Sequence, residues 1–235
     1  MTAAGPLRPK LLSIAGSDPS GGAGVQADLK TFAAFGAYGM AAITALTVQS
    51  TKGVLKVAPV SAALVAAQIE AIFDDIAVDA VKIGMLARPS TARAVAASLK
   101  RAGAQNIVLD PVLGASRGAD LSAAGLPRAI REHLAPLATL ITPNLAEAAI
   151  LTGAPIAKTT QEMEEQARAL VAAGAKAALV KGGHLDGAPV DVLCTDGATR
   201  IFHGERVETQ NTHGTGCALS SAVACLLARR RDGRP

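Results

Sequence analysis

Aromatic residues are scarce in this sequence, whose 235 residues include no Trp, one Tyr and four Phe. Proteins that bind single-stranded nucleic acid commonly stack successive bases on aromatic rings, and this chain has too few rings for such a platform. The net charge is +4, but residues 229–235 supply +3 of it through four arginines and one aspartate. The remaining +1 is too little for a basic binding face. We therefore expect no nucleic-acid partner.

Paired cysteines and long apolar runs are also lacking. Cys194, Cys217 and Cys225 form no C-x-x-C pair, which argues against a disulfide framework or a zinc site and favours a reducing compartment. Residues 1–10 contain no apolar run of signal-peptide length, so we do not expect a secreted protein. We expect a cytoplasmic location, which composition alone does not show. The uncharged segment 31–51 is comparable in length to the ~20 residues of a membrane span. Glycines, threonines and a glutamine interrupt it, so it predicts a helix end, a turn and a buried strand, and no membrane partner.

Short apolar runs alternate with longer Ala-rich stretches along the whole chain. This alternation predicts an α/β fold with a mostly parallel central sheet, helices on both faces and a small β edge. The expected strands lie near residues 10–15, 40–48, 79–83, 106–110, 138–142 and 177–181. The expected helices lie near residues 22–35, 61–75, 90–102, 144–152, 160–173 and 215–230. Runs 189–194 and 199–203, joined by Thr195, Asp196 and Gly197, predict an edge hairpin. We expect one domain over 1–235, with flexible tails at 1–9 and 229–235.

The loop after the first expected strand is rich in glycine. Gly22, Gly24 and Ala27 fit a relaxed dinucleotide-binding fingerprint. That fingerprint also needs an acidic residue about 20 positions later for the ribose, and residues 29–69 contain no Asp or Glu. No Gly-Lys-Ser or Gly-Lys-Thr follows, so the loop is not a P-loop. A tight turn in which Ser20 caps the next helix explains the glycines equally well.

A second glycine-rich loop, Thr212–Cys217, leads into the uncharged helix expected near 215–230. Glycines at a helix start expose several backbone N–H groups, and the helix dipole adds partial positive charge there. The loop therefore predicts an anion site. A thiol in the first turn would have its thiolate favoured, so the pKa of Cys217 is expected to fall below its free value of about 8.5. The alternative is a small buried hydrophobic residue, which is the interpretation we prefer for Cys225.

Three further polar positions follow expected strands. Asn144 and Glu147 are neighbours at a helix start, where they can either reach a magnesium ion or form a capping box. Lys181 ends an apolar strand and precedes two glycines, which suits an ammonium group that meets phosphate. Asp110 ends another strand, where it can serve a metal or cap a helix. In open sheets of this type, ligands bind at the carboxyl ends of the strands, so we expect these groups to converge.

Taken together, these segments resemble the hydroxymethylpyrimidine and phosphomethylpyrimidine kinases of thiamine biosynthesis, within the ribokinase-like superfamily. The resemblance runs from about Lys10 to Cys225 and rests on seven motifs in the family's order: Ala15–Lys30, Thr44–Gln49, Lys82–Leu86, Leu109–Val112, Thr142–Leu145, Lys181–His184 and Thr212–Cys217. It implies transfer of the ATP γ-phosphoryl group to the hydroxymethyl group of 4-amino-5-hydroxymethyl-2-methylpyrimidine, and then to the resulting monophosphate.

The resemblance also implies residue roles. The pyrimidine pocket would be formed by Gly16, Asp28, Gln49, Met85 and Val112. Asn144, Lys181 and Thr212 would bind the nucleotide, and Asp110 and Glu147 would serve Mg²⁺. The anion hole would be formed by Gly214, Thr215, Gly216 and Cys217. Cys217 stands where most ribokinase relatives carry an aspartate base, so its thiol is the candidate to accept the hydroxymethyl proton. A homodimer is implied as well.

The sequence departs from the family pattern at two places, and three alternative functions stay open. After Val112 the family usually has a Met and then a Lys-Ser-Gly run, whereas this chain has Leu113–Gly118, which leaves the second phosphorylation open. The chain also ends soon after the Cys217 helix. The nearest alternative is a pyridoxal or pyridoxine kinase of the same superfamily. A non-catalytic pyrimidine-binding protein and, more distantly, a nicotinamide oxidoreductase are the others.

Overall fold

The structure is a computed structural model that describes residues 8–114, 123–183, 185, 187–209 and 211–230. These residues form one sheet of nine strands in the order β3-β2-β1-β4-β5-β6-β7-β8-β9. The strands are β1 (Lys10–Ser17), β2 (Tyr38–Ser50), β3 (Gly53–Pro59), β4 (Ala80–Ile83), β5 (Ile107–Leu109), β6 (Leu140–Ile141), β7 (Ala177–Lys181), β8 (Val190–Thr195) and β9 (Ala198–His203). The tails were predicted at 1–9 and 229–235, and of these residues 1–7 and 231–235 lie outside the described residues. So do residues 115–118 of the loop Leu113–Gly118, which departs from the family pattern.

The centre of the sheet is parallel and both ends are antiparallel. Strand β1 pairs in parallel with β2 and β4, and the parallel pairing continues through β5, β6 and β7. Strands β8 and β9 form the predicted edge hairpin. The mostly parallel sheet and this edge are confirmed. Strand β3, which pairs antiparallel with β2 at the other edge, was not predicted.

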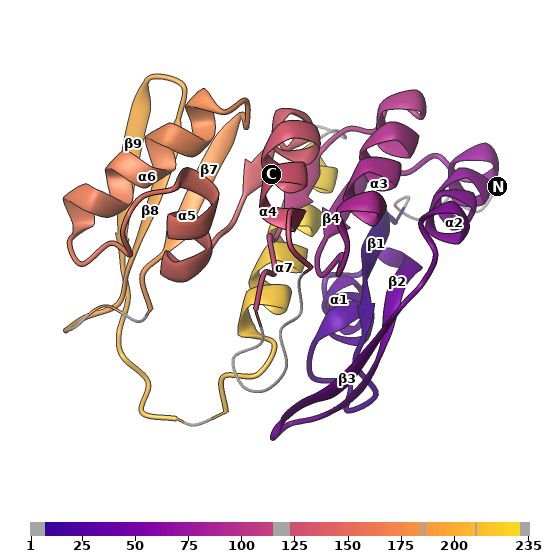
Figure 1. Ribbon diagram of the computed structural model, residues 1–235, viewed down its shortest axis with the longest axis horizontal. Coiled ribbons are helices and arrows are strands. Elements are labelled where there is room, and N and C mark those ends of the chain that lie inside the picture. Colours follow the sequence, from indigo (N-terminus) through magenta and orange to yellow (C-terminus); the bar gives the residue numbers. More distant parts are fainter. Residues whose placement is uncertain (1–7, 115–122, 184, 186, 210, 231–235) are drawn as a thin grey trace, which may run out of the picture.

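Helices cover both faces of the sheet. They are α1 (Gly24–Ala34), α2 (Ala62–Asp75), α3 (Pro89–Arg101), α4 (Leu126–Ala129), α5 (Leu145–Thr152), α6 (Thr160–Ala172) and α7 (Thr215–Arg230). Helices α1 and α7 pack together against the central strands, while α2 to α6 form a row across the sheet (Figure 1). Six of these helices were predicted; the short α4, which continues through irregular turns to Leu137, was not. Among the described residues, no helix is both long and apolar enough to span a membrane.

Local chemistry accounts for the helix starts. Ser61 caps α2 by accepting a hydrogen bond from the Leu64 amide, and Pro89 occupies the first turn of α3. Helices α5 and α6 each begin with a capping box. Strands β4 and β5 are buried at every position, as expected of parallel strands covered on both faces. The ends of β1, β5, β6 and β7 therefore form a rigid rim for the loops that follow them.

Candidate active site

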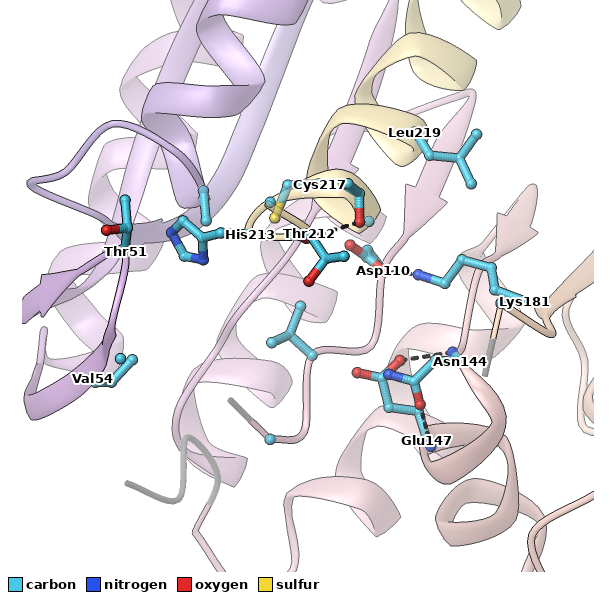
Figure 2. Close-up of a pocket in the computed structure, with 18 of the residues that line it drawn as sticks. Thr51, Val54, Asp110, Asn144, Glu147, Lys181, Thr212, His213, Cys217 and Leu219 are labelled. Carbon is cyan, nitrogen blue, oxygen red and sulfur yellow. Dashed lines mark hydrogen bonds and ion pairs between the residues drawn. The ribbon is translucent and has the colours of Figure 1, made fainter. Parts of the chain in front are cut away.

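A cavity of about 560 Å³ lies beyond the carboxyl ends of β5 and β7, beside the start of α7. This volume is typical of small-molecule sites. Its lining comes from the β2–β3 turn, the loop after β5, the start of α5, the end of β7 and the loop before α7 (Figure 2). Of the predicted site residues, the lining includes Gln49, Asp110, Val112, Asn144, Glu147, Lys181, Thr212, Gly214, Thr215, Gly216 and Cys217. The predicted convergence of these segments is confirmed.

The start of α7 is held by contact between the two glycine-rich loops. Gly214 has a φ of +79°, and a Cβ atom added there would lie 1.8 Å from the carbonyl oxygen of Gly22. Only glycine fits both the left-handed backbone and this close approach. The Ala218 amide donates to the Gly214 carbonyl at 2.9 Å, which makes Gly214 the cap residue and leaves first-turn amides of α7 without an intrahelical acceptor. This is the backbone arrangement on which the predicted anion site depends, and anion binding there stays a prediction.

Cys217 lines the cavity and is partly exposed, but its predicted acidity is wrong. Burial raises the pKa of the thiol above its ordinary value, and the negative charges of Asp110 and Asp28 act in the same direction. The ammonium group of Lys82 opposes them without reversing the shift. The thiol is therefore neutral at physiological pH, whereas the helix start alone led us to expect a favoured thiolate.

Asp110 and Lys181 form the charged centre of the cavity. Lys181 Nζ lies 3.1 Å from Asp110 Oδ1, and Asp110 is 3% exposed. The hydroxyl groups of Thr142 and Ser220 donate to the two oxygens of the same carboxylate at 3.2 and 3.3 Å. A Cβ added at Gly216 would come within 3.2 Å of Lys181 Nζ. The ammonium group therefore lies beside Gly216 in the first turn of α7.

Asn144 and Glu147 form the capping box that was one of the two predicted alternatives. The Asn144 amide donates to Glu147 Oε2, and the Glu147 amide donates to Asn144 Oδ1, both at 2.9 Å. Burial, aided by the charge of Asp110, raises the pKa of Glu147 to about 7. Asp110 and Glu147 are two neighbouring buried carboxylates, and Lys181 neutralises only part of their negative charge. The site therefore favours the binding of a further cation.

Three residues predicted for the pyrimidine pocket lie outside the cavity lining. Asp28 is fully buried, and its carboxylate meets Lys82 Nζ at 2.9 Å and the hydroxyls of Ser13 and Ser221 at 2.6 and 2.8 Å. This placement corrects the prediction that Asp28 bonds the ring edge, because its oxygens are already engaged. Gly16 and Met85 pack on each other, since a Cβ at Gly16 would lie 2.3 Å from Met85 Cε.

Sequence reasoning assigned no role to His213, Asp18 or Lys82. His213 lines the cavity, and its Nε2 lies 2.8 Å from Asp18 Oδ2. Both residues lie within the motifs quoted above, but the sequence does not show that they meet, because 195 residues separate them along the chain. Lys82 is a single charged residue within the apolar strand β4, a pattern that predicts a buried charge with a partner.

Comparison with known proteins identifies the architecture around this cavity. The family model described as phosphomethylpyrimidine kinase matches residues 18–234. The chain belongs to the phosphomethylpyrimidine kinase family. The hydroxymethylpyrimidine/phosphomethylpyrimidine kinase of Rhizobium meliloti is 52% identical over 219 residues, which cover 93% of this chain and 82% of that protein. Family membership makes the chain a phosphotransferase with a ribokinase-like fold, as predicted.

Solved structures agree with the assignment to the phosphomethylpyrimidine kinase family. The phosphomethylpyrimidine kinase of Clostridium difficile superposes with a TM-score of 0.83 at 40% identity, over 94% of this chain and 91% of that chain. The pyridoxal kinase of Bacillus subtilis, solved as an ADP complex, superposes with a TM-score of 0.86 at 39% identity, over 95% of this chain and 84% of that chain. Overall fold therefore does not separate the two kinds of kinase.

Proposed function

We propose that this chain transfers the γ-phosphoryl group of ATP to the hydroxymethyl group of 4-amino-5-hydroxymethyl-2-methylpyrimidine, and then phosphorylates the monophosphate. The observation that carries the proposal is the cavity itself, which places amides at the start of α7 beside Lys181 and near the apolar side chains of Val54 and Val112. The first set of groups suits phosphate oxygens, and the second suits a small ring.

Phosphoryl transfer depends mainly on positioning and on stabilising charge at the transferred group. In the proposed reaction the amides of Gly216 and Cys217 meet the developing negative charge, and preset donors of this kind each contribute on the order of 10²–10³ in rate. Lys181 neutralises phosphate oxygens as a point charge. Asn144 and Thr212 line the same cavity and are assigned to the nucleotide.

Cys217 is the candidate to accept the hydroxymethyl proton. Only the thiolate can accept this proton, and the raised pKa makes the thiolate scarce at neutral pH. Proton transfer through Cys217 therefore requires that the thiol first lose its own proton to solvent. In a loose transition state the attacking hydroxyl group keeps its proton until late, so the reaction demands little of this base. The backbone amides beside the thiol then carry the larger part of the rate enhancement.

Asp110 and Glu147 are proposed to hold Mg²⁺. Among the described residues, no group of three or more His, Cys, Asp or Glu side chains converges on a metal position. Mg²⁺ is commonly bound through one or two carboxylates together with water and phosphate oxygens, so this pair fits the ion. The ion supplies neutralisation of phosphate charge when bound. We further propose a cytoplasmic homodimer, with the exposed Leu46, Val48 and Leu55 of the β2–β3 hairpin as its apolar contact surface.

Pyridoxal phosphorylation is the second candidate, favoured by the likeness to the Bacillus subtilis enzyme. Parallel steady-state kinetics with the pyrimidine, pyridoxine and pyridoxal separate the two. We expect kcat/KM to be highest for the pyrimidine, and a higher value for pyridoxal would reverse the assignment. Release of ADP only when pyrimidine is added supports catalysis, whereas pyrimidine binding without ADP release would reject it.

A further inference from the structure

A partly buried contact joins the two glycine-rich loops at the edge of the cavity. His213 Nε2 lies 2.8 Å from Asp18 Oδ2. Asp18 is 2% exposed, and its carboxylate also accepts hydrogen bonds from the amide and hydroxyl of Ser20 and from the Ala23 amide. His213 immediately precedes Gly214 in the anion loop. The contact therefore couples the loop after β1 to the start of α7.

The position of the hydrogen in this contact follows from charge. Burial acts to raise the pKa of Asp18, but hydrogen bonds from His213, Ser20 and Ala23 outweigh burial and hold the pKa below its ordinary value. At neutral pH the side chain is a carboxylate, which can only accept hydrogen bonds. His213 Nε2 must therefore carry a hydrogen and donate it to Asp18.

Gln49 lies beside the same hydrogen. Its Nε2 atom is 3.4 Å from His213 Nε2, and its Oε1 atom is 3.1 Å from Thr47 Oγ1. Two N–H donors cannot bond each other, and the one hydroxyl hydrogen of Thr47 is already donated to the Ser17 carbonyl at 2.8 Å. A half-turn of the Gln49 amide exchanges its oxygen and nitrogen. The nitrogen then donates to Thr47 Oγ1, and the oxygen faces the His213 N–H, whose one hydrogen it shares with Asp18 as the weaker acceptor.

We propose that His213 and Thr47 are positioning residues that hold the Gln49 amide in this turned orientation, with its oxygen toward His213 and its nitrogen toward Thr47. Each amide atom then keeps one free position, an N–H on the nitrogen and a lone pair on the oxygen. Gln49 lines the cavity, so this donor and acceptor are available to a ligand there.

The fixed orientation specifies which ring edge Gln49 can bind, an inference that rests on the proposed function. A 4-aminopyrimidine presents a ring nitrogen that accepts and an amino group that donates, the pattern that a glutamine amide pairs with in adenine. An oxo group at position 4 reverses this pattern. A freely rotating amide would serve both rings, whereas an amide held by His213 and Thr47 selects the amino form.

Two pairs of variants test the selection. His213→Leu removes the donor and His213→Gln supplies another, while Thr47→Val removes the hydroxyl acceptor and Thr47→Ser keeps it. The measurement is kcat and KM for the aminopyrimidine and for its 4-oxo analogue. The preference is the ratio of kcat/KM for the aminopyrimidine to kcat/KM for the 4-oxo analogue. Loss of a fixed bidentate contact should lower this ratio about tenfold or more in the Leu and Val variants. Most of the loss should come from a higher KM for the amino substrate. The Gln and Ser variants should stay within about threefold of the parent. An unchanged preference in the Leu and Val variants, or a fall in kcat alone, would overturn the proposal.

The amide orientation is also measurable without turnover, by NMR of the intact chain. The turned orientation places the Gln49 amide hydrogens near the Thr47 methyl group, so nuclear Overhauser effects to that methyl should exceed those to the His213 ring. The opposite ranking would overturn the proposal even in an active enzyme and even if the His213 variants failed to fold. If the predicted ranking is seen in a chain that phosphorylates no pyrimidine, the orientation stands and the proposed function fails.

Discussion

Cys217 shows how burial and surrounding charge can outweigh the effect of a helix start on one side chain. The dipole at the start of α7 favours a thiolate, but burial and two nearby carboxylates raise the pKa of the thiol. Sequence reasoning identified the residue, its loop and its helix. It could not supply the charges, because Asp28 and Asp110 approach Cys217 only through folding.

The raised pKa predicts slow and pH-dependent alkylation of Cys217. Iodoacetamide should modify this thiol more slowly than free cysteine at pH 7.5, because only the thiolate reacts. The rate should keep rising as the pH passes the ordinary pKa of a cysteine thiol, because the pKa of Cys217 is shifted upward. Cys194 and Cys225 are 1% and 0% exposed and serve as internal controls that stay unmodified in the folded chain. Peptide mass analysis provides the rates, and an inflection below pH 8 would contradict the shift.

Replacing Cys217 with alanine tests its role in proton transfer. We expect Cys217→Ala to lower kcat by about 10²–10⁴, the range for loss of a general base. Calorimetry should show that the affinity for the pyrimidine stays within about threefold of the parent, a change in binding free energy of under about 1 kcal/mol. Near-normal turnover would remove the base role and leave the backbone amides as the catalytic groups.

At the scale of elements, prediction succeeded where apolar runs were long and failed where they were short or half exposed. Strands β1 and β4 and helices α2, α3 and α6 follow from apolar patterning and capping residues. Strand β3 was missed because its sequence, Gly53–Pro59, is mostly exposed or half buried. Helix α4 spans four residues, too few to show a helical period. A strand at the exposed edge of a sheet buries few side chains, so its sequence shows little of the apolar pattern that predicts a strand.

The loop before α7 depends on the absence of a side chain at Gly214. Gly214→Ala should lower kcat/KM for ATP by at least about 10², because its Cβ would force the anion loop away from Gly22 and disturb donors worth that much in rate. Gly204→Ala is the control, since its nearest neighbour lies 3.8 Å away in ordinary contact. Unchanged ATP kinetics in the Gly214 variant, with its fold verified by circular dichroism, would contradict this role of the loop.

At the scale of the whole molecule, a buried ion pair ties distant segments together. Asp28 on α1 binds Lys82 on β4, Ser13 on β1 and Ser221 on α7. The last two contacts span 15 and 193 residues of sequence. The α/β class and the site rim were predictable from the order of motifs, but this network was not, because no local pattern shows which buried polar groups meet.

Breaking that pair should cost far more stability than breaking an exposed one. Lys82→Met leaves the Asp28 carboxylate buried without its cation, so we expect the free energy of unfolding to fall by about 3–5 kcal/mol. The double variant Lys82→Met with Asp28→Asn should recover part of that loss. Arg101→Met, which breaks an exposed pair with Glu70, should cost under about 1 kcal/mol. Urea unfolding measures all three, and similar losses for Lys82→Met and Arg101→Met would contradict a central role for the buried pair.

Mass analysis of the products formed from 4-amino-5-hydroxymethyl-2-methylpyrimidine, ATP and Mg²⁺ tests the proposed activity most directly. We expect the parent chain to yield the monophosphate and then the pyrophosphate, and Cys217→Ala to yield little of either under the same conditions. Accumulation of the monophosphate alone would limit the chain to the first step. No phosphorylated pyrimidine from a folded chain that binds both ATP and the pyrimidine would contradict the catalytic role assigned to the cavity at the start of α7.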